Sequence, residues 1–167
     1  MKKIAFFVEG QTEQIFVDRL VREMLGRNNV SIILKRSQGG SNAPKQELVR
    51  RTEQARNPLW QALIYDCGSD NRVKSAIMEN LPNLTKSGYS FVAGLRDLYP
   101  LQLKELPQLK AGLKYLSPAQ AKRFADKFQI VVVVQEIETW FLAENHHFRR
   151  IDKRLTGQFI DNRLGFN

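Results

Sequence analysis

The sequence has few of the residues on which disulfide-stabilised or zinc-binding proteins depend. It contains one cysteine, Cys67, so an intramolecular disulfide is impossible and a reducing compartment is expected. The only two histidines, His146 and His147, are adjacent, and with one cysteine they match no structural zinc spacing. A catalytic pair of Cys67 with a histidine is disfavoured, because the histidines lie far along the chain in a polar segment.

Long hydrophobic runs are also missing. The apolar segment Ile130–Val134 spans five residues, far short of the about 20 that cross a bilayer. The apolar run after the basic N-terminus ends at Glu9, which is too short for a secretory signal. Because neither a membrane span nor a secretory signal is evident, we expect a cytoplasmic protein.

Ser37–Asn42 is rich in glycine but lacks the Lys-Ser/Thr ending of a P-loop, so we interpret it as a plain connection.

Positive charge is what the chain has in excess. Its 26 Lys and Arg against 17 Asp and Glu give a formal net charge of +9, whereas 43% hydrophobic and 26% charged residues are ordinary for a globular protein. This surplus favours a polyanionic partner, with nucleic acid the first candidate. The basic residues are dispersed along the chain, and the candidates for contacts with nucleic acid are Lys35, Arg36, Lys74 and Arg96.

Apolar strands alternate with amphipathic helices along most of the chain. The clearest helix follows Thr12, its expected N-cap, with apolar residues at helical spacing from Val17 to Leu25. The pattern predicts further helices over Pro44–Arg56, Asp70–Glu79 and Leu101–Phe128 (interrupted at Ser117-Pro118), and strands over Ile4–Val8, Val30–Lys35, Ala62–Tyr65, Tyr89–Leu95 and Ile130–Val134. The last strand, apolar throughout, is typical of one buried on both faces.

This alternation predicts an α/β fold with a mostly parallel sheet and helices on both faces. No internal repeat or linker interrupts it. We expect a single domain over residues 1–167, with a polar, basic tail from about residue 146.

Carboxylates stand at the ends of three predicted strands: Glu9, Asp66 and Asp97. The carboxyl ends of parallel strands meet at one edge of a sheet, where open α/β folds bind ligands. We therefore expect the three side chains to share that edge. Glu136 and Glu138 follow the last strand in the same way, although acids there also suit the first turn of a helix.

Carboxylates gathered at one edge repel each other unless a cation neutralises them. Oxygen-only ligands suit Mg²⁺ or Mn²⁺. Two such ions about 3.5–4 Å apart can hold the attacking and leaving oxygens of a phosphoryl transfer. A basic surface around an acidic metal pocket therefore predicts an enzyme that acts on nucleic acid.

The segment Val8-Glu9-Gly10-Gln11-Thr12-Glu13, followed by strand-end Asp66 and Asp97, resembles the TOPRIM-like superfamily. That superfamily includes topoisomerases, bacterial primases and nucleases of the OLD (overcoming lysogenization defect) type. With the segments Tyr65–Gly68, Gly94–Asp97 and Glu136–Ala143, the chain is similar more narrowly to a small bacterial family of unknown function. The likeness spans about Lys3 to Asp152.

The resemblance implies a TOPRIM-like, Rossmann-type fold that uses Mg²⁺ or Mn²⁺. It makes Glu9 the acid/base or metal-ligating glutamate and Asp66 and Asp97 the catalytic metal ligands, with Glu138 a further metal candidate. The chain departs from the superfamily in having Asp66-Cys67-Gly68 and Asp97-Leu98-Tyr99 where Asp-x-Asp is usual. Either a second ligand comes from Asp70, Glu136 or Glu138, or one metal binds, or the site is degenerate.

Two hypotheses follow. The first is a metal-dependent nuclease or other enzyme of phosphodiester transfer; the second is a non-catalytic module that binds nucleic acid or a protein partner. Geometry separates them: convergence of Glu9, Asp66 and Asp97 within reach of one ion favours the enzyme, and pairing with Arg96 favours the module. The sequence leaves open the choice between DNA and RNA and the oligomeric state.

Overall fold

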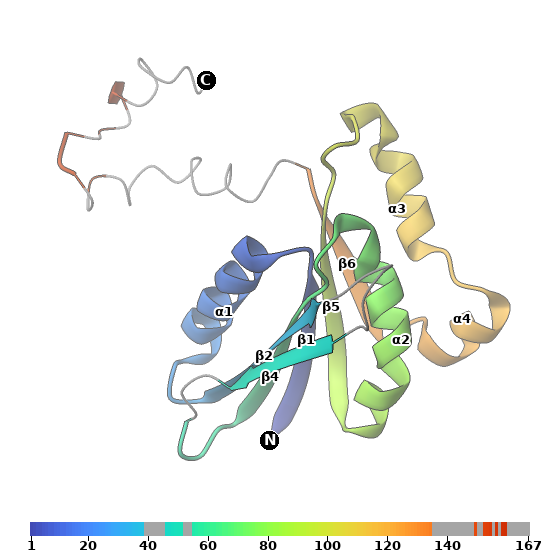
Figure 1. Ribbon diagram of the computed structural model, residues 1–167, viewed down its shortest axis with the longest axis horizontal. Helices are drawn as coiled ribbons and strands as arrows, with labels where there is room; N and C mark the ends of the chain where they lie inside the picture. Colours follow the sequence, from blue (N-terminus) through green and yellow to red (C-terminus); the bar gives the residue numbers. More distant parts are fainter. Residues whose placement is uncertain are drawn as a thin grey trace. The chain divides into compact units, whose positions relative to one another are not determined.

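The computed structural model describes residues 1–38, 46–51 and 55–134, together with 149, 152–154, 156 and 158–159. The chain forms two compact units, Met1–Val134 and Gln135–Asn167. The first unit contains the sheet (Figure 1). In the second, Arg154 and Asp152 form an ion pair at 2.7 Å. None of the helices in the described ranges has the length and apolar character that crossing a membrane requires.

The first unit is an α/β domain built on one six-stranded sheet in the order β3-β2-β4-β1-β5-β6. Neighbouring strands are parallel except β2 and β3. The predicted fold class is therefore confirmed. In chain order the elements are β1 (Lys2–Val8), α1 (Gln11–Leu25), β2 (Val30–Gln38), β3 (Gln46–Arg51), β4 (Trp60–Asp66), α2 (Val73–Lys86), β5 (Tyr89–Asp97), α3 (Leu106–Lys114), α4 (Pro118–Phe124) and β6 (Phe128–Val133).

Alternate residues of the strands build two hydrophobic cores, one on each face of the sheet. In β1, Ala5 and Phe7 belong to the core that includes α2, whereas Val8 belongs to the core that includes Val17 and Val21 of α1. Side chains of successive strand residues point to opposite faces, so a strand that is apolar throughout can serve both cores. Helices therefore cover both faces, as predicted.

The start of α1 differs from the prediction, because Gly10 and not Thr12 is its N-cap. Helix α1 begins at Gln11, and Glu13 in its first turn accepts a hydrogen bond from the Gly10 N–H at 2.9 Å. The carboxylate of Glu13 thus accepts from the backbone N–H of the N-cap residue, as the acid at the third helical position does in a capping box.

The predicted helix over Pro44–Arg56 is wrong. Gln46–Arg51 is instead strand β3, which pairs antiparallel with β2 at the edge of the sheet. Only Leu48 and Val49 are apolar in this segment, so it has no helical stripe to bury. Pairing with the open edge of β2 satisfies its backbone groups and decides the outcome.

The helix predicted over Asp70–Glu79 is longer than expected. It starts with a 3₁₀ turn, Asp70–Arg72, and α2 then continues through Pro82 to Lys86. The last turns remain helical because Leu81 and Leu84 are buried in the core, which offsets the hydrogen bond that proline removes. The predicted start of α4 is confirmed, with Ser117 as its N-cap.

Strand β6 is not buried on both faces. It forms the last strand of the sheet, and the Val131 side chain is 44% exposed. Its run of β-branched residues indicated a strand correctly, but strand order depends on contacts far apart in sequence. The segment that carries Glu136 and Glu138 lies outside the described residues.

Candidate functional site

Glu9, Asp66 and Asp97 lie at the carboxyl edge of three adjacent strands, as predicted. Val8 is the register partner of Asp66, so Glu9 lies just beyond the end of β4. On the other side of β1, the Asp97 N–H donates to Glu9 Oε1 at 2.8 Å. The carboxyl ends of β4, β1 and β5 therefore form one edge that holds all three residues.

The connections of the fold make this edge a place for a ligand. Strand β1 leads into α1 on one face of the sheet, and its neighbour β4 leads into α2 on the other face. Adjacent strands whose helices depart to opposite faces leave a crevice at their carboxyl ends, and open α/β folds bind ligands there. Glu9 and Asp66 end these two strands.

Glu9 is neutralised inside the protein. Its Oε1 accepts from Arg96 Nη1 at 2.8 Å as well as from the Asp97 N–H, and Arg96 Nη2 donates to Asn71 Oδ1 at 3.2 Å. Glu9 is 7% exposed and Arg96 is 5% exposed. The pair is thus a buried, charge-assisted hydrogen bond of the kind that is costly to break from one side.

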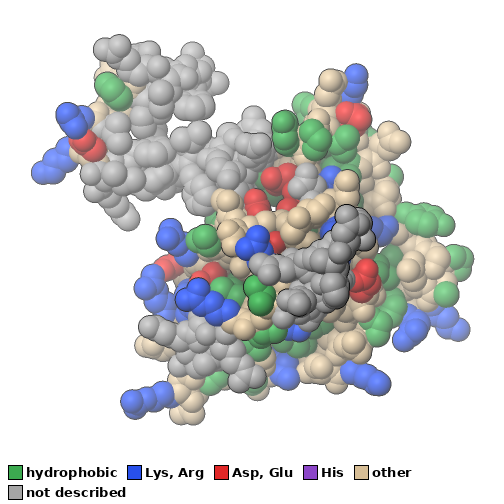
Figure 2. All heavy atoms as spheres, viewed as in Figure 1, with side chains coloured by type: hydrophobic (Ala, Val, Ile, Leu, Met, Phe, Trp, Pro, Cys, Tyr) green, Lys and Arg blue, Asp and Glu red, His purple; other side chains and the backbone are tan. Residues whose placement is uncertain are grey.

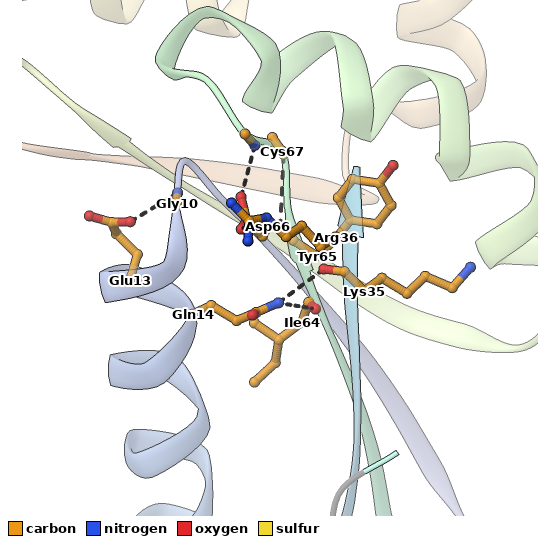
Figure 3. A network of polar contacts seen from close by, with 10 residues as sticks. Gly10, Glu13, Gln14, Lys35, Arg36, Ile64, Tyr65, Asp66 and Cys67 are labelled. Carbon is orange, nitrogen blue, oxygen red and sulfur yellow. Dashed lines mark hydrogen bonds and ion pairs between the residues drawn. The ribbon is translucent and has the colours of Figure 1, made fainter. Parts of the chain in front are cut away.

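Asp66 is neutralised less completely, although it is more deeply buried, at 1% exposed. Its Oδ1 accepts from the Gly68 N–H at 2.8 Å. Its Oδ2 lies 3.3 Å from Arg36 Nε, within ion-pair distance, but makes no hydrogen bond to any described residue. The Arg36 guanidinium therefore attracts Asp66 electrostatically without donating a hydrogen bond to its Oδ2. Figure 3 shows Arg36 beside Asp66.

The turn after β4 is built to hold Asp66. Gly68 has a φ of +73°, a left-handed conformation that a side chain disfavours. The Cys67 N–H donates to Val8 O at 2.9 Å, which continues the pairing of β4 with β1 past the strand end. The glycine therefore allows the backbone to fold back onto the Asp66 carboxylate.

Gln14 connects helix α1 to the strand ends beneath the carboxylates. Its Nε2 donates to Lys35 O at 2.9 Å and to Ile64 O at 3.1 Å, which lie on β2 and β4 (Figure 3). The Lys35 side chain extends away from Asp66 in the same view. Gln14 thus fixes the spacing of the two strands that carry Arg36 and Asp66.

The thiol of Cys67 responds to both carboxylates. Burial, and then the charge of Asp66, raise its pKa to about 12, with a smaller contribution from Glu9, while Arg72 lowers it. The charges of both acids therefore act on the same buried thiol. A thiol with this pKa is protonated at neutral pH, which excludes Cys67 as a thiolate nucleophile in this state.

Residues 8–161 match a family described as a domain of unknown function, DUF4276. The match covers more than half of the chain. The chain belongs to the DUF4276 family. No protein of curated function and no solved structure matches it.

The DUF4276 match includes every candidate site residue, but the structure brings only some of them together. Among the described residues there is no group of three or more His, Cys, Asp and Glu placed to hold one metal ion. Lys74 contacts the carbonyl oxygens of Gly112 and Tyr115, each at 2.6 Å, and burial lowers its pKa. Glu138 lies outside the described residues.

Sequence reasoning did not find the residues next to the carboxylates of the candidate site, Asn71, Arg72 and Gln14. Asn71 and Arg72 lie in the 3₁₀ turn after β4, and Gln14 lies on α1. Gln14 follows directly on the Glu-Gly-x-Thr-Glu segment, and its place there was the one signal available. The positions of Asn71 and Arg72 depend on the 3₁₀ turn Asp70–Arg72, which the sequence pattern predicted only as part of a regular helix.

Proposed function

We propose that this DUF4276 chain is a cytoplasmic nucleic-acid-binding module whose carboxyl edge, at the ends of β1 and β4, contacts the phosphate backbone. The observation that carries this proposal is that an arginine neutralises each of the two carboxylates there: Arg96 contacts Glu9, and Arg36 contacts Asp66. Pairing with Arg96 is the geometry that favours the binding module over the enzyme.

The carboxylates give the arginines their orientation. Arg36 is held through Nε, and its side chain is 41% exposed, so the guanidinium is open to solvent. A planar guanidinium with several fixed donors suits a phosphate group. Because Glu9 is already neutralised by Arg96, its charge repels an approaching phosphate less. The net charge of +9 adds a general attraction for a polyanion. Figure 2 shows Lys and Arg side chains interspersed with acidic side chains over the side of the molecule in view.

Binding to labelled single- and double-stranded DNA and RNA across a salt series tests this proposal. We expect affinity that falls steeply with salt, because released counterions dominate it. Arg36→Gln should weaken binding. Arg27→Gln removes the same charge just after the C-terminal end of α1, away from the carboxyl edge of the sheet, and should weaken binding less. Equal effects of the two variants would place the phosphate contacts elsewhere.

A second candidate function is a Mg²⁺- or Mn²⁺-dependent phosphodiester-cleaving or -transferring enzyme, in line with the TOPRIM resemblance. The observation that favours it is Asp66 Oδ2, a buried carboxylate oxygen without a hydrogen bond from the described residues. Such an atom is costly in a folded protein unless a charge or donor reaches it. A hard divalent cation is a partner of the right chemistry.

Asp66 would be the principal ligand, and the negative charges of Glu9 and Asp97 would add electrostatic attraction, because in the described residues the three carboxylates do not form a group placed to hold one ion. The metal would supply stabilisation of charge on phosphate oxygens and activation of water. Arg36 would then be released from Asp66 to contact the substrate phosphate. Glu9 fits less well as a ligand in this state, because Arg96 and the Asp97 N–H already occupy its Oε1.

Thermal unfolding with Mg²⁺, Mn²⁺ or EDTA tests the metal, because an ion that binds only the folded state raises Tm. Asp66→Asn should remove the increase in Tm, and Asp97→Asn and Glu9→Gln should reduce it. Asp126→Asn, just before the start of β6 and not at the carboxyl edge, should leave the increase unchanged. Cleavage of the same oligonucleotides should need the metal and Asp66. Clear binding without cleavage under any metal would leave the binding module as the function.

A further inference from the structure

The outer edge of β6 has the properties of a strand-binding groove. β6 is the last strand of the sheet, and in the described part of the chain no strand pairs with its outer side. Its sequence Phe-Gln-Ile-Val-Val-Val contains no charge and no proline. Proteins usually protect an exposed edge with such residues, because an open, apolar edge invites another strand.

The backbone of β6 presents hydrogen-bonding groups away from the sheet. The carbonyl of Lys127 accepts from the N–H of Val92 in β5 at 3.3 Å, and the carbonyl of Val133 accepts from the N–H of Leu98, just after β5, at 2.8 Å. In a strand the N–H and C=O of one residue point to the same side, and the side alternates with each residue. The N–H and C=O groups of Phe128, Ile130 and Val132 therefore point outward.

A cavity of about 900 Å³ lies along this edge. It is lined by Phe128–Val132 of β6, by Leu113 of α3 and Leu116 just after it, and by Ala121 of α4 and Ala125 at its C-cap. Helices α3 and α4 lie beyond β6 at the side of the sheet (Figure 1). The cavity is thus bounded by an open strand edge on one side and by apolar helix residues on the other.

Helix α3 has an apolar side but no buried residue. A helix of nine residues depends on packing of its apolar side for stability. In the described contacts of α3 that side faces the cavity through Leu113. A segment bound along β6 would supply the missing packing partner.

Charge defines the chemistry of that segment. The charged residues that line the cavity are Lys110, Lys114 and Asp126, so its lining is net positive. The stretch from Lys104 to Lys127 carries six basic residues and two acidic ones. A second copy of this chain fits poorly, because pairing two β6 strands would bring two such basic stretches together. Figure 2 shows hydrophobic side chains and Lys and Arg side chains together over α3 and α4.

We propose that β6, α3 and α4 form a docking groove for an extended, acidic segment of a partner protein, which adds a strand to the sheet at β6. The outward backbone groups of β6 supply affinity, alternate apolar side chains enter the cavity, and acidic side chains contact Lys110 and Lys114. This surface is distinct from the carboxyl edge of β1 and β4.

Fluorescence anisotropy with a labelled short peptide of alternating Val and Glu tests the groove, with the matching Val and Lys peptide as its partner probe. We expect the acidic peptide to bind and the basic one not to. Lys110→Glu with Lys114→Glu should weaken binding by up to about tenfold, the range expected for two rim charges. Lys122→Glu, the same substitution at a single lysine outside the cavity lining, should have little effect.

Val132→Pro gives an independent test, because it removes an outward N–H and leaves the ladder to β5 intact. Binding of the acidic peptide should be lost while the circular dichroism spectrum is retained. If Val132→Pro unfolds the chain, the two-lysine variant still decides. Equal binding of both peptides, no binding, or equal effects of the Lys110/Lys114 and Lys122 variants would overturn the proposal. So would displacement of the peptide by an oligonucleotide, or a dimer in solution that Val132→Pro abolishes.

Discussion

Glu9 and Asp66 end neighbouring parallel strands, yet the protein neutralises them differently. Glu9 contacts a buried guanidinium and a backbone N–H. Asp66 contacts one backbone N–H and an arginine that is 41% exposed, and its Oδ2 has no hydrogen bond among the described residues. The charge of Glu9 is neutralised by a buried arginine, and the charge of Asp66 is neutralised by an arginine that is partly exposed at the surface.

This difference gives Glu9 a structural role, whereas the proposed function assigns the ligand contact to Asp66 and Arg36. The Arg96–Glu9 pair joins the end of β5 to the end of β1, and Arg96 also reaches Asn71 after β4. It therefore holds three strand ends in place. Asp66 is left with a buried oxygen that a phosphate-bound cation or a moving Arg36 can serve. The repulsion expected from the sequence is relieved at Glu9 by an arginine on the adjacent strand β5.

The largest expected effect is that of removing Arg96. Arg96→Met leaves the Glu9 charge buried without its guanidinium partner, so we expect a loss of about 3–5 kcal/mol in the free energy of unfolding. Urea denaturation measures it. The double variant Arg96→Met with Glu9→Gln should recover part of this loss, because it removes the stranded charge. No recovery would mean that Arg96 stabilises the fold through other contacts.

The second effect is a pH dependence through Cys67, the buried thiol that directly follows Asp66. Its pKa is raised from 9.0 to about 12 in the folded protein, first by burial and then by Asp66. Stability due to the neutral thiol is therefore complete below about pH 9 and falls as pH rises towards 12, by up to roughly 1.4 kcal/mol per pH unit. The slope of unfolding free energy against pH should be shallower in Cys67→Ser.

The pKa of the Cys67 thiol also measures the effects of the two carboxylates relative to each other. Asp66 raises the pKa of Cys67 more than Glu9 does. Alkylation of the thiol by iodoacetamide should therefore begin at a lower pH in Asp66→Asn than in the wild type, with a smaller shift in Glu9→Gln. A larger shift in Glu9→Gln would reverse the assignment of the dominant charge.

A smaller effect is expected for Asp66→Asn on stability. The substitution removes a buried charge whose arginine is open to solvent, so the free energy of unfolding should stay within about 1 kcal/mol of the wild type. Glu9→Gln should destabilise more, because it leaves Arg96 buried beside a neutral partner. Denaturation of the two single variants checks the contrast; equal losses would show that Asp66 is as firmly integrated as Glu9.

The sequence predicted the positions of the carboxylates better than their surroundings. Glu9, Asp66 and Asp97 each follow an apolar strand, and parallel pairing brings strand ends together, so local pattern was sufficient. The partners Asn71 and Gln14 come from a turn and a helix whose contacts depend on strand order. The same limit explains β3 and β6, since an edge strand and a central strand can have similar sequences.

The last and smallest expected effect concerns the coupling between Arg36 and Asp66. A double-mutant cycle with Arg36→Gln and Asp66→Asn should give a coupling energy of about 0.2–1 kcal/mol, because Arg36 is partly solvated and makes no hydrogen bond to Asp66 Oδ2. The cycle for Arg96 and Glu9 should give a clearly larger value. A weak coupling means that Arg36 leaves Asp66 at little cost when a phosphate arrives. A coupling equal to that of the buried pair would fix Arg36 in place, and the phosphate contact would have to come from another residue at this edge.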